Sequence, residues 1–210
     1  FGDLKQHVAD YGALTGAPVD YDELDYCLVL VLVRFCVGIS MGIAKGGVDV
    51  DVPMLVKFLQ VNLFALIKIM ARLSGVPALE SMPQPHGAAA TRALYDFVGA
   101  SLTAQIKPAV QEPYLLARLD GLAGLNSYLR NVADYGPDRL HTEELAALRA
   151  VLGRDVSSVH EGRLALPDAL EKASDAQRAQ MLPWLLQRSA LEHALMKDML
   201  GPMFDRALSY

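Results

Sequence analysis

Residues 21–45, YDELDYCLVLVLVRFCVGISMGIAK, form the stretch of sequence that decides the fold. The run ends at Gly46-Gly47, a pair that favours the end of a helix. Acidic residues crowd its first turn, where they suit the positive end of the helix dipole, and Asp20 or Asp22 is the candidate N-cap. Because apolar residues occur nearly all round the helix, the pattern predicts a helix at the centre of the domain.

The most apolar part of this run, residues 27–44, is just long enough to cross a bilayer, which needs about 20 apolar residues. Arg34 lies near its middle, and an unpaired charge at that depth is costly in lipid. The sequence therefore favours a buried core helix, and no membrane partner is expected. Gly38, Gly42 and Gly46 are spaced by four and predict a groove that another helix can approach closely.

Outside this run, Leu and Ala dominate and apolar residues recur at intervals of three and four, without a long alternating β pattern. We expect an all-α fold, a helical bundle made of two packed helical subdomains. Three prolines interrupt the helical pattern in the middle of the chain. We therefore divide the chain into a helical lobe at 1-75, a proline-rich linker at 76-87 and a helical bundle at 88-210. A long strap across the surface is the alternative for the proline-rich segment.

Capping residues mark the ends of other helices. Asp51 followed by Pro53 predicts the start of one long helix. Ser174 with Gln177 three residues later predicts a capping box at the start of the last long helix. Pro183 lies too far inside that helix for its first turn, so we expect a kink there or a later start.

The composition excludes several classes of protein. The chain has 210 residues, of which 52% are hydrophobic and 20% charged, so it can bury a core and is not expected to be disordered. Its 19 basic and 24 acidic residues give a net charge of −5. Nucleic-acid binding favours a basic surface that replaces condensed counterions, so no nucleic-acid partner is expected.

The two cysteines indicate a reducing compartment. Cys27 and Cys36 are nine residues apart, so on a helix they point to opposite faces, with α-carbons about 13 Å apart. This separation is too large for a disulfide. We expect two buried, reduced thiols and a cytoplasmic location.

Catalytic signatures are mostly absent. The sequence contains no glycine-rich phosphate loop and no Gly-x-Ser-x-Gly elbow. None of the histidines has a second ligand at the spacing of a His-Glu-x-x-His site, so no metal and no cofactor are expected in this chain. Glu192 and His193 are adjacent, but neighbouring helical side chains diverge by about 100°, so we interpret His193 as a solvated or capped surface residue.

Arg34 is the one candidate binding residue. Its side chain can pack along the core and reach a carboxylate or the carbonyls at a helix end. Alternatively, its guanidinium lies at the floor of a pocket and binds a phosphate or carboxylate in bidentate fashion.

The N-terminal part of the chain resembles a known family. Residues 3–43 look like the C-terminal helical lobe of aminoglycoside-phosphotransferase-like kinases, of the type related to the kinase part of acyl-CoA dehydrogenase fusion proteins. In that type a helix ending Tyr-x-x-x-Thr-Gly-x-Pro-Val-Asp leads into a long apolar helix. The matching residues are Tyr11, Thr15, Gly16, Pro18, Val19 and Asp20. Residues 88–170 are similar to a small accessory helical domain of unknown function that accompanies such kinases, and residues 116–137 and 144–153 carry this resemblance.

The resemblance implies a non-catalytic part of a small-molecule kinase. The family's catalytic Asp loop and metal-binding Asp precede these helices and have no equivalent here, so ATP and Mg²⁺ would be bound by other residues of a longer protein. This part would contribute packing and part of an acceptor-substrate pocket. The alternatives are a helical protein-interaction or oligomerisation module, which forms a homo-oligomer, and a small-ligand-binding helical domain without enzymatic activity.

Overall fold

The computed structural model describes residues 4–47, 50–84 and 87–206. Within these ranges the chain is helical and has no strand, which confirms the all-α helical bundle. The helices are, in chain order, α1 (Leu4–Thr15), α2 (Tyr21–Lys45), α3 (Val52–Leu73), α4 (Arg92–Ala100), α5 (Pro113–Tyr135), α6 (Pro137–Leu152), α7 (Val159–Lys172), α8 (Asp175–Leu195), α9 (Lys197–Leu200) and α10 (Met203–Arg206). α4 continues as a π-helical turn, Ser101–Ile106, and a 3-10 turn, Lys107–Ala109.

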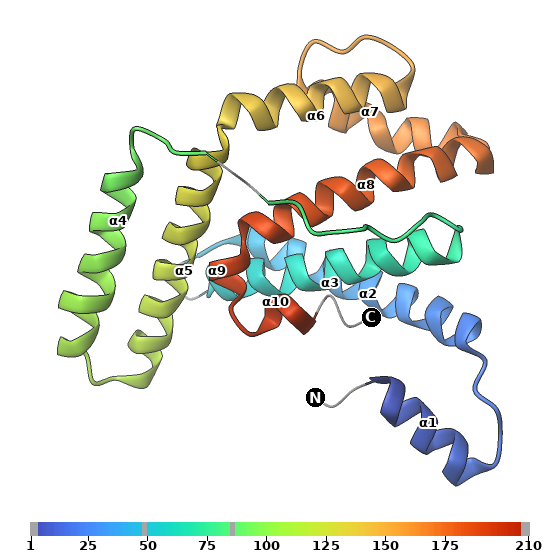
Figure 1. The fold of residues 1–210 in the computed structure, drawn as a ribbon, viewed down its shortest axis with the longest axis horizontal. Helices are drawn as coiled ribbons and strands as arrows, with labels where there is room; N and C mark the ends of the chain where they lie inside the picture. Colours follow the sequence, from blue (N-terminus) through green and yellow to red (C-terminus); the bar gives the residue numbers. More distant parts are fainter. Residues whose placement is uncertain (1–3, 48–49, 85–86, 207–210) are drawn as a thin grey trace.

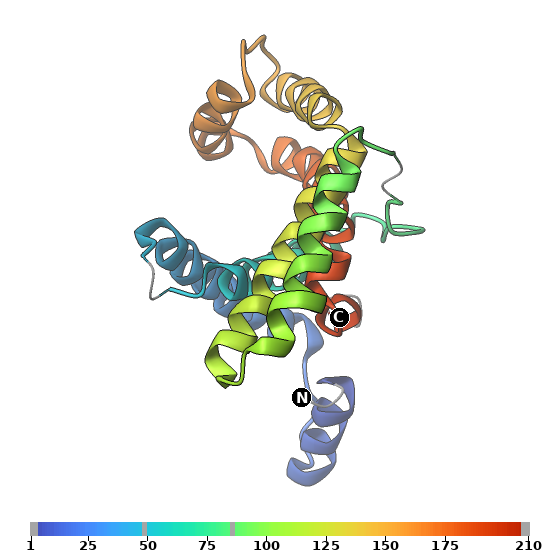
Figure 2. The ribbon, with the colours of Figure 1, turned by 90° about the vertical axis from the view of Figure 1, so that its left-hand side faces the viewer.

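The helices pack largely as pairs that are consecutive in the chain (Figure 1). α2 packs against α3, α4 against α5, and α6 against α7. α8 then returns along α3, and α9 packs against α5. Figure 2 shows α4 and α5 side by side as an arm of the molecule, while α1 projects from its body in both views.

The core is built around α3, which has buried residues on several sides. Between α3 and α8 the buried residues are Phe64, Ile67, Ala71, Leu186 and Ala190. Between α3 and α2 they are Leu32, Cys36, Ala65, Leu66 and Ile69. At the start of α3, Val56 and Val61 pack against Met196, Met199 and Leu200, which belong to α9 and the residue before it. α3 is therefore the central helix of the described chain.

The prediction that residues 21–45 form the central helix is wrong, because α3 and not this segment is at the centre. They do form one helix, α2, but its side chains are buried mainly along the line that meets α3, as at Leu32 and Cys36. Cys27 is exposed, contrary to the expectation of two buried thiols, while Cys36 is buried and both are free. An apolar pattern all round a helix indicates that every side of the helix can be buried. It does not show that other helices of the same chain bury all of these sides.

The proline-rich segment after α3 lies along the core as a strap. Val76, Leu79 and Met82 pack against the cluster between α3 and α8. Gln60 on α3 also donates a hydrogen bond of 3.1 Å to the carbonyl of Ser189 on α8. The N-terminal and C-terminal regions on either side of the strap thus share one core.

The capping predictions are confirmed. The Asp20 carboxylate accepts hydrogen bonds from two backbone N–H groups of the first turn of α2, and Asp51 caps α3 by accepting one from the backbone N–H of Met54. Ser174 and Gln177 form the predicted capping box at the start of α8. Pro183 lies inside α8, which is one helix in the structure and begins eight residues before it.

His193 is buried, so the interpretation as a surface residue is wrong. Its ring packs between the rings of Phe64 and Phe204, with centroids 4.6 and 4.7 Å away. Nε2 lies 3.0 Å from the Phe204 carbonyl oxygen and therefore donates the hydrogen bond. Burial lowers the pKa of His193, and the charge of Lys68 lowers it further, against raising effects from the Phe204 carbonyl and Asp205.

Two leucines on α2 test the arrangement of the core. Leu32 is 9% exposed and Leu30 is 54% exposed. We expect Leu32→Ala to lower the free energy of unfolding by about 2–5 kcal/mol, and Leu30→Ala to change it by less than about 1 kcal/mol. Urea denaturation at a concentration where sedimentation shows a monomer measures both. Equal losses at the two positions would contradict the assigned packing of α2.

The buried histidine predicts a pH dependence of stability. Because folding lowers the pKa of His193, the unfolded chain takes up a proton more readily below about pH 6.5. The free energy of unfolding should therefore fall as the pH falls from about 7 to about 5. His193→Gln should flatten this slope in urea denaturation, whereas His141→Gln, at an exposed position of α6, should keep it. A wild-type slope in His193→Gln would contradict the prediction.

Candidate functional site: the exposed apolar face of α2

One side of α2 presents apolar side chains to solvent along most of its length. We call this surface the α2 face; it consists of Tyr26, Leu30, Val33, Phe35, Val37 and Met41. These side chains are between 42% and 61% exposed. The two ends of the helix differ in charge, with Asp22 and Glu23 in the first turn and Lys45 in the last. Contiguous apolar patches of this kind mark interaction sites more often than free surface.

The total surface of the chain is larger than that of a compact monomer. The accessible surface is 13091 Å². A compact monomer of this mass exposes about 9,600 Å², so the chain exposes roughly 3,500 Å² more than expected. Obligate interfaces bury about 2,000–5,000 Å² in total over both partners. The excess belongs to the whole chain, in which α1 and the α4–α5 arm also project, so it shows an extended molecule and does not measure the α2 face.

Arg34 lies within the α2 face, one helical turn from both Leu30 and Val37, and is exposed to solvent. It lines a shallow groove between α2 and α3, together with Val31, Phe35 and Leu55, of about 500 Å³. Arg34 makes no hydrogen bond or ion pair with any residue that the structure describes. It is therefore not the core arginine that reaches a carboxylate or a helix end, and its role as an anion-binding residue stays a prediction.

The glycines of α2 contribute to this groove in different ways. A Cβ atom at Gly42 would meet Leu55 of α3 at 3.3 Å, so Gly42 permits close packing inside the chain. A Cβ atom at Gly38 would meet nothing within 4 Å. The predicted glycine groove is thus used by α3 at Gly42 and is open at Gly38.

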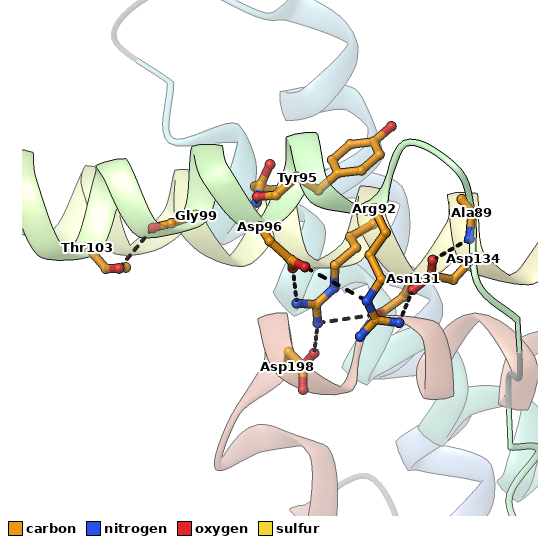
Figure 3. Close-up of polar contacts among 11 residues, drawn as sticks. Ala89, Arg92, Tyr95, Asp96, Gly99, Thr103, Asn131, Asp134 and Asp198 are labelled. Carbon is orange, nitrogen blue, oxygen red and sulfur yellow. Dashed lines mark hydrogen bonds and ion pairs between the residues drawn. The ribbon is translucent and has the colours of Figure 1, made fainter.

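A network of arginines and aspartates lies where α4, α5 and α9 meet (Figure 3). Arg130 on α5 pairs with Asp96 on α4 at 3.2 Å and with Asp198 on α9 at 3.1 Å. Arg92 pairs with Asp134 at 2.9 Å and lies 3.9 Å from Asp96. Each arginine is shared between two carboxylates, and the network joins three helices. We assign it to the attachment of the α4–α5 arm and not to ligand binding.

A second polar network connects α5, α6, α7 and α8. The Tyr128 hydroxyl donates to Glu192, which also accepts from Arg188 at 2.9 Å. Arg188 lies 3.6 Å from Glu144, and Glu144 pairs with Arg163 at 2.6 Å. Burial raises the pKa of Tyr128, and the negative charge of Glu192 raises it further, so the phenol remains a hydrogen-bond donor. The carboxylates are held by these partners, and the network acts as a tie between helices.

Chemical groups for catalysis are not gathered on the α2 face. Among residues 4–47, 50–84 and 87–206, no three His, Cys, Asp or Glu side chains lie close enough together to hold a metal ion. α2 and α3 are long and apolar enough to cross a membrane by length and composition, with mean hydropathies of 2.4 and 1.7. Core helices of soluble proteins pass the same criterion, and this explanation fits α3 better than α2, because only 6% of the apolar window of α2 is buried within the chain. Length and composition by themselves do not assign a membrane to either helix. What the α2 face offers is a surface for contact.

Comparison of the chain with models of protein families, with curated proteins and with solved structures gives no match.

Two arginines provide a test of the assignment of Arg34. Arg72 on α3 pairs with Asp25 on α2, a residue that is only 7% exposed. Arg72→Met leaves this carboxylate without its cation and should lower the free energy of unfolding by about 1–3 kcal/mol. Arg34→Met should change it by less than about 0.5 kcal/mol. Urea denaturation measures both, and a large loss in Arg34→Met would show that Arg34 has a structural partner.

Proposed function

We propose that this chain is a non-catalytic helical packing module of a phosphotransferase-like small-molecule kinase, and that its α2 face is covered by the part of the enzyme that carries the chemistry. The exposed apolar α2 face is the observation that carries the proposal. Residues 3–43 resemble the C-terminal helical lobe of aminoglycoside-phosphotransferase-like kinases. This resemblance suggests that the partner is the catalytic part of such a kinase. The total accessible surface, which is larger than that of a compact monomer of this mass, agrees with a chain that packs against further protein.

The division of labour follows from the chemistry of phosphoryl transfer. That reaction needs a positioned base, a metal ion and a grip on the phosphates. The proposal assigns ATP, Mg²⁺ and these residues to the partner, and it assigns the apolar contact to α2. Arg34 then lies within the interface, where its guanidinium can bind a carboxylate or phosphate of the partner or of the acceptor substrate.

Self-association through the same face is the second candidate. Two α2 helices packed antiparallel bring the acidic first turn of one copy, Asp22 and Glu23, close to Lys45 of the other. Opposite charges at both ends of the pair favour this orientation over a parallel one. In this case the chain is a homo-oligomeric interaction module.

A charged variant of the α2 face tests both candidates. Leu30→Glu combined with Val37→Glu places two carboxylates in the exposed face while α3 keeps its contacts with Leu32. We expect the variant to fold, and to lose binding of the part of the longer protein that carries the Asp-based catalytic loop, when that part is co-expressed as a separate polypeptide. Leu164→Glu, at a position of α7 that is 67% exposed, is the matched control and should bind as the wild type does.

The readouts are co-purification and sedimentation velocity. Loss of co-purification in the double variant alone supports the kinase module. Concentration-dependent association of the wild type that the double variant lacks supports the homo-oligomer. Flotation of the wild type with lipid vesicles, abolished in the double variant, would assign a membrane to the α2 face and overturn both candidates. Wild-type chain that stays monomeric and binds none of these would also contradict the proposal.

A further inference from the structure

The α4–α5 arm carries a second exposed apolar surface, separate from the α2 face. We call it the arm face; it consists of Leu94, Phe97 and Val98 on α4 and Leu115, Leu122 and Leu129 on α5. These side chains are between 43% and 69% exposed. α4 is the outermost helix on this side of the molecule in Figure 1, so the arm face is open to a partner.

The apolar residues of α4 point away from the contacts that attach the arm to the body. Asp96 pairs with Arg130 at 3.2 Å, and Arg130 also reaches Asp198 on α9. Leu94 and Val98 are each two positions from Asp96. At about 100° per residue they therefore lie on the opposite side of α4. The helix uses its polar side for attachment and leaves its apolar side free.

α5 is covered on two sides and free on a third. A Cβ atom at Gly121 would meet Pro53 of α3 at 3.1 Å, so the body covers this side closely. On another side, Asn126 donates a hydrogen bond of 2.8 Å to the carbonyl of Tyr95 on α4. The exposed leucines follow at intervals of seven, at Leu115, Leu122 and Leu129. This heptad spacing is typical of a helix that packs along another helix.

The charges of the arm are balanced. Residues 88–136 contain four basic and four acidic residues, so the net charge of −5 comes from the rest of the chain. Lys107 pairs with Asp120 at 2.6 Å, and Glu112 accepts backbone hydrogen bonds as the N-cap of α5. Two identical surfaces bring identical charges together when they associate. A surface without net charge can therefore meet its own copy without electrostatic repulsion, whereas a strongly charged partner finds no complementary charge there.

We infer that the arm face binds the arm of a second copy of this chain. Each arm supplies two antiparallel helices, and two arms together form a four-helix bundle with the leucines in its core. The three leucines are spaced symmetrically about Leu122, as a contact with a twofold axis requires. With the two α5 helices antiparallel, Leu122 meets its own copy, and Leu115 meets Leu129 of the partner subunit.

Sedimentation velocity over a series of concentrations tests the pairing. It is performed on the Leu30→Glu/Val37→Glu variant, in which the charged α2 face no longer associates, and we expect dimers at high concentration. Adding Leu122→Glu should weaken dimerisation about a hundredfold, because each dimer contains this residue twice. Leu164→Glu on α7 is the matched control and should leave dimerisation unchanged. A monomer at every concentration, or equal weakening by the two substitutions, would overturn the inference.

Cysteine cross-linking tests the orientation. Cys27→Ser removes the exposed thiol, and Cys36 is buried. In this background Leu122→Cys should form a disulfide dimer, since a disulfide joins α-carbons less than about 7 Å apart. Leu115→Cys by itself should not, because its two copies lie about 21 Å apart along an antiparallel pair. A mixture of Leu115→Cys and Leu129→Cys chains should cross-link.

The opposite pattern would contradict the arrangement. Cross-linking of Leu115→Cys with itself, without cross-linking to Leu129→Cys, would show a parallel pair, and no cross-link at any of the three positions would overturn the inference. None of these outcomes depends on the α2 face or on a catalytic partner, so the arm contact and the proposed function can fail separately.

Discussion

The structure depends on the burial of α3 by helices from both halves of the chain. Its residues Phe64 and Ile69 are each 1% exposed, one in the cluster with α8 and the other in the cluster with α2. Each such side chain contributes about 1.5–3 kcal/mol relative to exposure. Because α8 lies more than a hundred residues after α3, this burial requires the chain to fold back on itself, and it sets the path of the strap between them.

The central place of α3 has a consequence for α2. A helix packed on one side of a central helix keeps its other side free, and α2 has apolar residues on that side too. Exposed apolar area of this size is a cost in water, at about 25 cal/mol per Å². The physical need to cover it is the basis of the proposed interface.

Much of the fold could be predicted from local signals. Asp20, Asp51 and Ser174 cap helices as predicted, because a cap depends on residues within three or four positions. The candidate site could be predicted only in part. Arg34 was found because a charge interrupts an apolar run, yet its partners depend on packing. The exposure of Leu30 and Val37 was missed, since an apolar pattern all round a helix gives no local signal of which side the chain itself covers.

By itself the sequence determined the helices and the caps at their ends, because these properties depend on neighbours along the chain. The tertiary structure decided which apolar surface is covered from within. It buried His193 between two phenylalanines and left Leu30 in solvent. The local sequence around each residue does not indicate this burial or this exposure. The reason is that burial depends on contacts between residues far apart in sequence. The hydrophobic effect is non-directional, so an apolar pattern does not specify which part of the chain will cover it.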